Sequence, residues 1–184
     1  SFIIAASSCF IKQRYDYLKV IAGDAGDALA VCTGWGAREW WAVCPSEGNL
    51  KTRTLGLVSS IAAGLALALP QRKVIAIDGD GAFLMNLCGL PTIALQNPGN
   101  LIHLLFDNEI FEASGGTATA SSVADAVALA RAAGYKNASW VGTPEEFRAE
   151  FVSAWRRGEL TLIAVKVDPG QPKNLPHLRL DELE

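Results

Sequence analysis

The sequence predicts a three-layer α/β/α fold with a mainly parallel β-sheet, and two observations support this. Apolar runs of strand length, at residues 74–78, 101–107 and 160–167, alternate along the chain with segments of helical character. These runs are apolar at nearly every position, as parallel strands are when helices bury both of their faces. The connections between such strands should be right-handed crossovers.

The first half of the chain begins with a predicted helix at residues 15–22, where apolar side chains recur on one face. Residues 28–33 are a predicted buried strand bounded by glycines, and a helical turn is expected at 37–41. Residues 45–49 combine proline, serine, glycine and asparagine and are predicted to form a loop. The alanine- and leucine-rich segment 58–69 predicts a closely packed helix that a proline ends.

The second half starts with a predicted strand at residues 74–78 and a helix at 84–95. A strand at 101–107 follows, and then a helix at 123–133 that a glycine ends. Residues 138–141 are predicted to form a short strand. This regular alternation of strands and helices is typical of parallel α/β domains.

The last helix should begin at residues 143–146, where a threonine N-cap precedes a proline and two glutamates. Proline suits the first turn of a helix, and the glutamates lie near its positive end. The last strand is predicted at 160–167. We therefore expect a single domain at residues 15–170, with an N-terminal tail at 1–14 and a C-terminal tail at 171–184.

The composition excludes some classes of function. The chain has 184 residues and a formal net charge of −3, which gives no support to nucleic-acid binding. No apolar run approaches the 18 or so residues that would span a membrane. Half of the residues are apolar and only 19% are charged, compared with about 25% in typical globular domains. The low charge predicts that another subunit covers part of the surface.

The four cysteines show no spacing typical of metal sites. Cys9, Cys32, Cys44 and Cys88 contain no CxxC pair, which disfavours both zinc and iron–sulfur binding. We expect them to be small buried side chains of a protein that works in a reducing compartment, the cytoplasm.

Polar residues follow two of the predicted strands. Gly79-Asp80-Gly81 follows the strand at 74–78, and Asn108 follows the strand at 101–107, 28 positions after Asp80. Mg²⁺ prefers oxygen ligands and usually takes one or two carboxylates together with phosphate oxygens. Asp80 offers a carboxylate and Asn108 an amide oxygen. The glycines allow backbone N–H groups to approach a phosphate closely, and the helix after Gly81 should present its positive end to the same anion.

The residues from 77 to 116, IDGDGAFLMNLCGLPTIALQNPGNLIHLLFDNEIFEASGG, resemble the fingerprint of thiamine-diphosphate-dependent 2-oxoacid decarboxylases. RTLGLVSSIAAGL (53–65), LARAAGYKNA (129–138) and TLIAVKVDPG (161–170) are also similar to sulfopyruvate and phosphonopyruvate decarboxylases, including the β subunit of the former. The similarity covers residues 15–170. It implies the thiamine-diphosphate-binding fold and the part of the site that holds the cofactor's diphosphate.

The resemblance also implies roles for individual residues. Thiamine diphosphate and Mg²⁺ would be the cofactors, and the main-chain carbonyl of Ile110 would complete the metal ligands that Asp80 and Asn108 begin. Leu55 would hold the cofactor in a bent conformation, and Glu109 is a second candidate catalytic residue. The implied cofactor-binding residues are Arg53 (through its carbonyl), Leu55, Gly79, Asp80, Gly81, Ala82, Asn108 and Ile110.

The chain departs from the family pattern at three positions. Arg53 stands where glycine is usual, Leu57 where histidine is usual and Thr117 where glutamine is usual. The glutamate that activates the cofactor's pyrimidine ring belongs to a second domain in this family. We therefore expect a pyrimidine-binding partner subunit and a hetero-oligomer that decarboxylates a small 2-oxoacid of the sulfopyruvate or phosphonopyruvate kind.

Two alternatives remain open. One is a carboligase of the acetolactate synthase type, and the other is a non-catalytic module that binds the cofactor for regulation. Among the remaining polar residues, His103 lies inside an apolar run and should be a core histidine. Arg38 and Glu39 should form a surface ion pair.

Overall fold

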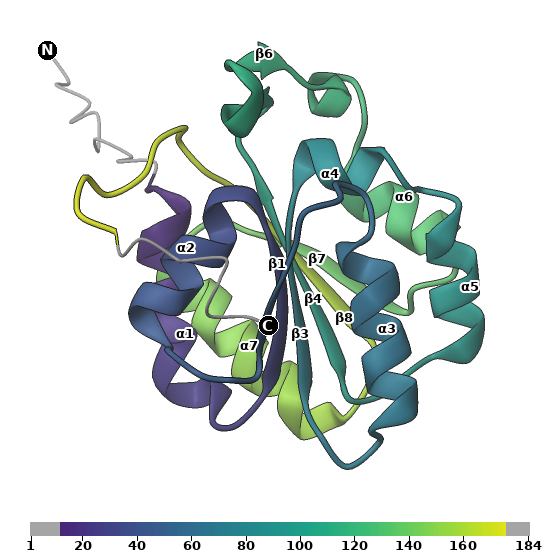
Figure 1. The fold of residues 1–184 in the computed structure, drawn as a ribbon. Coiled ribbons are helices and arrows are strands. Elements are labelled where there is room, and N and C mark those ends of the chain that lie inside the picture. Colours follow the sequence, from purple (N-terminus) through teal and green to yellow (C-terminus); the bar gives the residue numbers. More distant parts are fainter. Residues whose placement is uncertain (1–11, 176–184) are drawn as a thin grey trace, which may run out of the picture.

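The computed structural model describes residues 12–175. Six strands form a parallel sheet in the order β2-β1-β3-β4-β8-β7, and helices cover both of its faces (Figure 1). The α/β/α fold expected from the sequence is confirmed. The sheet strands are β1 (Leu29–Thr33), β2 (Asn49–Thr52), β3 (Val74–Gly79), β4 (Leu101–Asp107), β7 (Asn137–Val141) and β8 (Thr161–Lys166).

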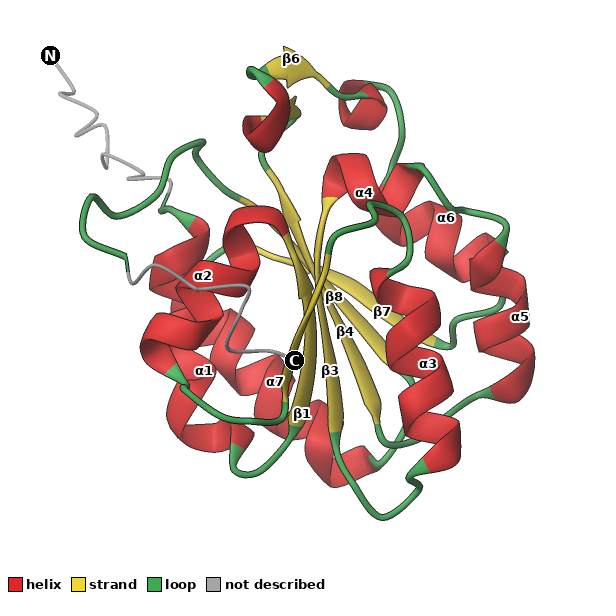
Figure 2. Ribbon diagram, viewed as in Figure 1, coloured by secondary structure: helices red, strands yellow, loops and turns green. Residues whose placement is uncertain are grey.

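Seven α-helices are present in the described part of the chain. Three of them, α1, α2 and α7, cover one face of the sheet, and α3, α5 and α6 cover the other, with the short α4 beyond the strand ends (Figure 2). They are α1 (Arg14–Ala25), α2 (Gly34–Val43), α3 (Val58–Ala68), α4 (Asp80–Leu84), α5 (Gly89–Gln96), α6 (Ala126–Ala132) and α7 (Pro144–Arg157).

A small antiparallel hairpin projects beyond the carboxyl ends of the sheet strands. Its strands are β5 (Ile110–Phe111) and β6 (Thr117–Ala118), and the 3₁₀ turn η1 (Glu112–Ser114) lies between them. A second 3₁₀ turn, η2 (Ala120–Ser122), leads from the hairpin towards α6.

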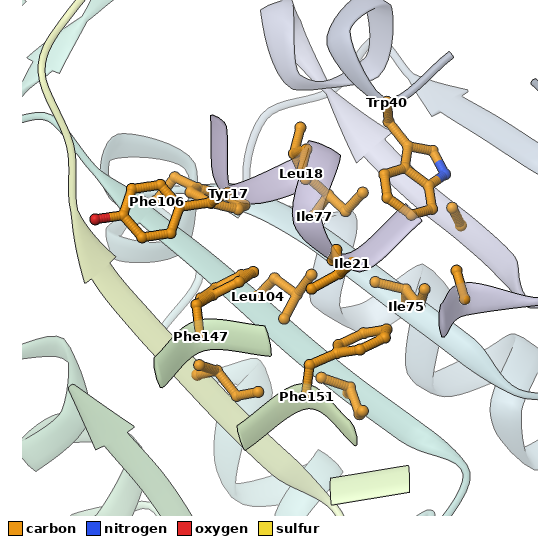
Figure 3. Packing of buried hydrophobic residues seen from close by; sticks show 14 of the residues in the cluster. Tyr17, Leu18, Ile21, Trp40, Ile75, Ile77, Leu104, Phe106, Phe147 and Phe151 are labelled. Carbon is orange, nitrogen blue, oxygen red and sulfur yellow. The ribbon is translucent and has the colours of Figure 1, made fainter. Parts of the chain in front are cut away.

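The apolar core is divided by the sheet into two clusters, one on each face. In the cluster under α1 and α7, Tyr17, Phe106 and Phe147 pack ring to ring (Figure 3). The Tyr17 and Phe147 rings meet edge to face with their centroids 5.4 Å apart, a favourable geometry for aromatic pairs. Such aromatic side chains fix α1 and α7 against the strands that end at the site described below.

One strand was not expected from the sequence, and one expected helix was wrong. The region predicted to be a loop is followed by the edge strand β2, whose Leu50 is exposed, so the apolar alternation that signals a strand is missing there. The helix predicted at 84–95 is two shorter helices, α4 and α5. Pro91 lies in the first turn of α5, where it is tolerated, but inside one continuous helix its ring would clash with the preceding turn.

Three other expectations, on a helix cap, a histidine and the cysteines, can be compared with the structure. At the start of α7, the Thr143 hydroxyl accepts a hydrogen bond from the Glu146 amide, which confirms the predicted N-cap. The Glu146 side chain also completes a capping box, which was not predicted. His103 is fully buried in β4, with its Nε2 3.4 Å from Asp78 Oδ2, so it is a core histidine. Among the described cysteines, Cys32 is buried, but Cys88 is exposed and the expectation of burial was wrong for it. None of the helices in residues 12–175 has the length and apolarity to cross a membrane.

Candidate cofactor site

The candidate site lies where the order of strands in the sheet reverses. From β1 the chain moves outwards to β2, and it then returns to add β3 and β4 on the other side of β1. In open α/β sheets, ligands bind in the crevice outside the carboxyl ends of the strands at such a point. The segments that follow β1, β3 and β4 all line one cavity there.

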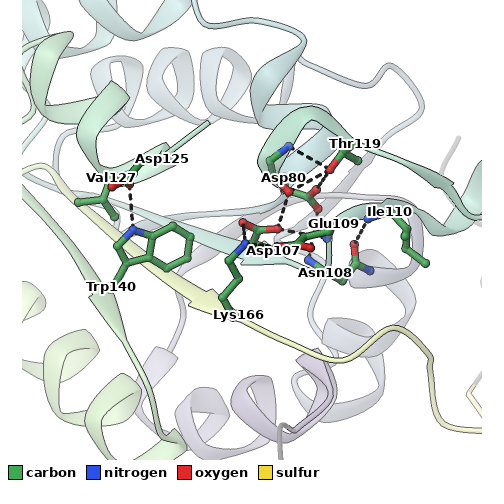
Figure 4. A network of polar contacts seen from close by, with 11 residues as sticks. Asp80, Asp107, Asn108, Glu109, Ile110, Thr119, Asp125, Val127, Trp140 and Lys166 are labelled. Carbon is green, nitrogen blue, oxygen red and sulfur yellow. Dashed lines mark hydrogen bonds and ion pairs between the residues drawn. The ribbon is translucent and has the colours of Figure 1, made fainter. Parts of the chain in front are cut away.

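Asp80 lines this cavity and directly follows β3. Gly79, the last residue of β3, pairs with Phe106 of β4, so the two strand ends lie side by side. The Asp80 carboxylate is buried and accepts a hydrogen bond from the Thr119 hydroxyl (Figure 4). Its Oδ1 atom is 3.5 Å from the amide nitrogen of Asn108. The structure thus brings together Asp80 and Asn108, which are distant in sequence, as the sequence predicted.

The surroundings of Asp80 favour a cation. Burial raises the pKa of this carboxyl group; the hydrogen bond from Thr119 opposes the rise, and the nearby Asp107 charge adds to it. A carboxylate that is desolvated and lies beside another carboxylate is stabilised when a positive charge approaches it.

The side chain of Asn108 forms a tight turn with its own backbone. Its Oδ1 accepts the Ile110 amide at 3.2 Å, and the intervening Glu109 has a positive φ of 62°. The Asp80 carboxylate and the Asn108 amide oxygen therefore lie at adjoining strand ends, and Ile110, whose main-chain carbonyl was the third predicted donor, follows Asn108 by two residues and lines the same cavity. These hard oxygen donors fit Mg²⁺. No cluster of three or more histidine, cysteine, aspartate or glutamate side chains suited to a metal occurs in residues 12–175.

A second polar chain fixes the neighbouring strand end (Figure 4). Asp107 is buried, accepts the Ser121 hydroxyl at 2.9 Å and pairs with Lys166 Nζ at 2.8 Å. Lys166 also pairs with Glu109 Oε1 at 2.6 Å. Glu109 is exposed and lies outside the set of residues that line the cavity, so its carboxylate faces β8.

The cavity itself is small, and an aromatic ring forms part of its wall. Its volume is about 80 Å³, whereas pockets for small molecules usually exceed about 300 Å³. The ring of Phe111 lies directly on Gly81, where an added Cβ would be 2.2 Å from Phe111 Cε1. A ligand as large as a nucleotide or a thiamine cofactor must therefore extend beyond this cavity.

Most of the predicted site residues line this cavity, namely Leu55, Gly79, Asp80, Gly81, Ala82, Asn108 and Ile110. Arg53 is exposed and is not among the lining residues. The helix that follows Gly79 has only five residues, so the expected long helix with a strong positive end is absent from this position. The role that remains for the glycines is to let backbone N–H groups approach a phosphate closely.

Several lining residues were not predicted from the sequence. Arg14, Phe111 and Glu112 belong to the cavity wall. Glu39, expected in a surface ion pair with Arg38, is fully buried and pairs instead with Arg14. No sequence pattern could have linked these positions, because Arg14 and Glu112 are 98 residues apart.

The fold and the site together define a parallel α/β domain with a buried carboxylate and further oxygen donors in the crevice at its switch point. Comparison with known proteins narrows this class. Residues 30–165 match the family described as the thiamine pyrophosphate enzyme, C-terminal TPP binding domain. The chain belongs to this family.

The curated relatives include sulfopyruvate decarboxylase subunit beta from two archaea. The chain is 38% identical to that of Methanothermobacter thermautotrophicus over 67% of both chains, and 32% identical to that of Methanococcus maripaludis over 91% of this chain and 90% of the relative. It is 33% identical over 82% of its length to phosphonopyruvate decarboxylase from Streptomyces hygroscopicus, but spans only 39% of that relative.

Solved structures share the fold. Benzoylformate decarboxylase from Polynucleobacter necessarius matches 90% of this chain with a TM-score of 0.71 and 20% identity. A thiamine diphosphate-dependent 4-hydroxybenzoylformate decarboxylase from Rhodococcus jostii matches 85% with a TM-score of 0.72 and 21% identity. The chain covers 34% and 32% of these two proteins, about a third of each.

Proposed function

We propose that this chain is the diphosphate- and Mg²⁺-binding subunit of a thiamine-diphosphate-dependent, non-oxidative 2-oxoacid decarboxylase of the cytoplasm. In this proposal residues 15–170 form the cofactor domain. The observation that carries it is the environment of Asp80. Its carboxylate is buried, its pKa is raised by desolvation and by the Asp107 charge, and it lies beside Asn108 where two adjoining strands end. The family and the named decarboxylase relatives support the same activity.

The metal and the diphosphate would be held by groups at these strand ends. Asp80, Asn108 and the carbonyl of Ile110 would coordinate Mg²⁺, and the metal would neutralise the diphosphate. The backbone of Gly79, Gly81 and Ala82 would approach the phosphate oxygens, because the absence of a side chain at the glycines leaves the N–H groups accessible.

The reactive part of the cofactor would be oriented by the loop before α3. Thiamine diphosphate, when bound, supplies the carbanion that adds to the 2-oxo carbon and the electron sink for loss of carbon dioxide. Leu55 lines the cavity beside the diphosphate loop and would support the bent conformation of the cofactor. The carbonyl of Arg53 would accept a hydrogen bond from it. Glu109 is the weaker catalytic candidate, since its carboxylate already pairs with Lys166.

The named relatives and the small cavity support the proposed substrate and partner. The named relatives support a small 2-oxoacid of the sulfopyruvate or phosphonopyruvate kind. A relative named as a β subunit supports a second subunit, which would carry the pyrimidine-binding side and the activating glutamate. The small cavity agrees with this, because the remainder of the cofactor would lie against the partner.

A carboligase is the second candidate within the enzymes, supported by 29% identity over 112 residues to an acetolactate synthase large subunit of Escherichia coli. A non-catalytic cofactor-binding module is the candidate from another class, supported by the departures from the family pattern at Leu57 and Thr117. Product analysis separates the three: an aldehyde indicates a decarboxylase, a 2-acyl-2-hydroxyacid formed from two 2-oxoacids indicates a carboligase, and cofactor binding without turnover indicates a non-catalytic module.

The decisive experiment uses this chain co-expressed with its pyrimidine-binding partner. Calorimetry should detect Mg²⁺-dependent thiamine diphosphate binding to the assembled complex, and an Asp80→Ala variant should lose it while it remains folded. Turnover of 2-oxoacids should require both subunits. Unchanged cofactor binding by Asp80→Ala would reject the ligand assignment, and full turnover by the isolated chain would reject the need for a partner.

A further inference from the structure

Three charged side chains from distant parts of the chain meet at the cavity wall, which two of them line. Arg14 is the first residue of α1, Glu39 lies in α2 and Glu112 begins η1. Arg14 Nε contacts Glu39 Oε2 at 2.6 Å, and its Nη2 contacts Glu39 Oε1 at 3.1 Å. The same Nη2 contacts Glu112 Oε2 at 3.2 Å. One guanidinium thus joins two carboxylates, and we call these three residues the arginine triad.

The arginine triad is almost completely shielded from water. The exposed fraction of the side chain is 10% for Arg14, zero for Glu39 and 14% for Glu112. Burial by itself would lower the pKa of the Arg14 guanidinium, but the hydrogen bonds and charges of Glu39 and Glu112 raise it, so Arg14 stays charged. Buried ion pairs add little net stability compared with apolar packing, yet they allow few alternative geometries. This property suits a group that fixes a segment in place.

The segment that the arginine triad holds is the hairpin over the site. Glu112 directly follows Phe111, whose ring lies on Gly81, and it lies two residues after Ile110. Glu112 also accepts a hydrogen bond from the Gly170 amide. At the other end of the hairpin, Thr119 donates to Asp80. The hairpin is therefore anchored on both sides of its tip, at Glu112 and at Thr119.

We propose that the arginine triad is a positioning unit, which anchors residues 110–114 so that the Ile110 carbonyl and the Phe111 ring are preorganised beside Asp80. Arg14 and Glu39 act through Glu112 and do not touch the reacting atoms. The effect on cofactor binding rests on the proposed function, whereas the anchoring of the hairpin does not. Fixing a ligand-bearing segment before binding raises affinity, because less freedom is lost on binding.

The test compares variants of the arginine triad with a matched surface pair. Glu112→Gln keeps the size of the side chain and leaves the Arg14–Glu39 contacts intact. It removes the charge and one of the two acceptor oxygens that bind Arg14 and Gly170, so it weakens only the anchor of the hairpin. Arg14→Lys keeps the charge but removes the forked geometry that reaches both carboxylates. Arg148→Gln is the control, because Arg148 makes the same two-bond contact with Asp24, at 2.6 and 3.2 Å, on the exposed α1–α7 surface.

The first readout is amide hydrogen exchange, which needs no cofactor. The amide of Gly116 donates to the Phe111 carbonyl at 2.9 Å inside the hairpin and reports on its opening. Exchange at Gly116 should rise about tenfold in Glu112→Gln and in Arg14→Lys, since a charge-assisted contact is lost. It should not change in Arg148→Gln. Unchanged exchange at Gly116 in both triad variants would overturn the anchoring.

The second readout is the affinity of the assembled complex for Mg²⁺ and thiamine diphosphate, measured by calorimetry well below the melting temperature. Affinity should fall about tenfold in Glu112→Gln, the scale seen for groups that support a metal ligand. Faster exchange with unchanged affinity would overturn the positioning role and leave a purely structural one. A wild-type complex that binds no cofactor would refute the proposed function, while the exchange data would still decide the anchoring.

Discussion

The contact between Phe111 and Gly81 predicts that a single methyl group should disturb the hairpin over the site. A Cβ built on Gly81 would lie 2.2, 2.7 and 2.9 Å from three atoms of the Phe111 ring, so Gly81→Ala must displace the ring. Gly81 does not have a positive φ, and its backbone therefore accepts alanine without strain. Gly81→Ala should therefore affect stability by displacing the Phe111 ring and not by straining the backbone.

The magnitude follows from the burial of that ring. Phe111 is half-buried, and moving it into water should cost about 1–2 kcal/mol. Alanine in place of glycine in helix α4 recovers about 0.5–1 kcal/mol of backbone entropy. The net loss should be about 1 kcal/mol, which corresponds to a fall in melting temperature of about 2–4 °C for a domain of this size. Gly64→Ala is the control, because Gly64 lies in α3 with nothing within 4 Å of the added Cβ. It should raise the melting temperature by about 1–4 °C.

Thermal unfolding of the single and double variants tests this reasoning. In a Phe111→Ala background the obstruction is gone, so Gly81→Ala should become stabilising, as Gly64→Ala is. The coupling between the two substitutions should therefore be about 1–2 kcal/mol. If the effects of Gly81→Ala and Phe111→Ala simply add, the ring does not lie on Gly81.

Three further predictions concern the site and the scaffold. Leu55→Ala should lower the turnover of the assembled complex more than its cofactor affinity, because a bent cofactor brings reacting groups together. Turnover equal to that of the wild type would contradict this. A loss of folding stability alone would make Leu55 a packing residue. Asp80→Asn should not destabilise the metal-free chain, because it removes a buried charge and keeps the acceptor for Thr119. The same substitution should abolish Mg²⁺ binding. A lower melting temperature without metal would show that the charge itself is needed for folding. Thr143→Ala should cost about 1 kcal/mol by removing the N-cap of α7, none of whose residues lines the cavity. Urea unfolding measures this cost, and unchanged cofactor affinity would confirm that the effect is confined to stability.

The sequence by itself determined the architecture and the candidate ligands. Strands such as β3 and β4 are apolar throughout because helices bury both faces, and this property is visible in any short stretch of chain. Because carboxyl ends of neighbouring parallel strands meet at one edge, the polar residues after these strands had to lie close together. Asp80 and Asn108 could therefore be paired without a structure.

Only the tertiary structure decided what surrounds those ligands. Arg14 meets Glu112 across 98 residues, and the ring of Phe111 meets Gly81 across a folded hairpin. Such contacts leave no local periodicity, because they depend on how helices and loops pack after the sheet has formed. The two misjudged segments have local causes instead: the exposed edge strand β2 lacks a buried pattern, and Pro91 starts a separate helix because it is tolerated only in the first turn. Local pattern thus fixes which strand ends carry the chemistry, and long-range packing fixes the geometry in which that chemistry is held.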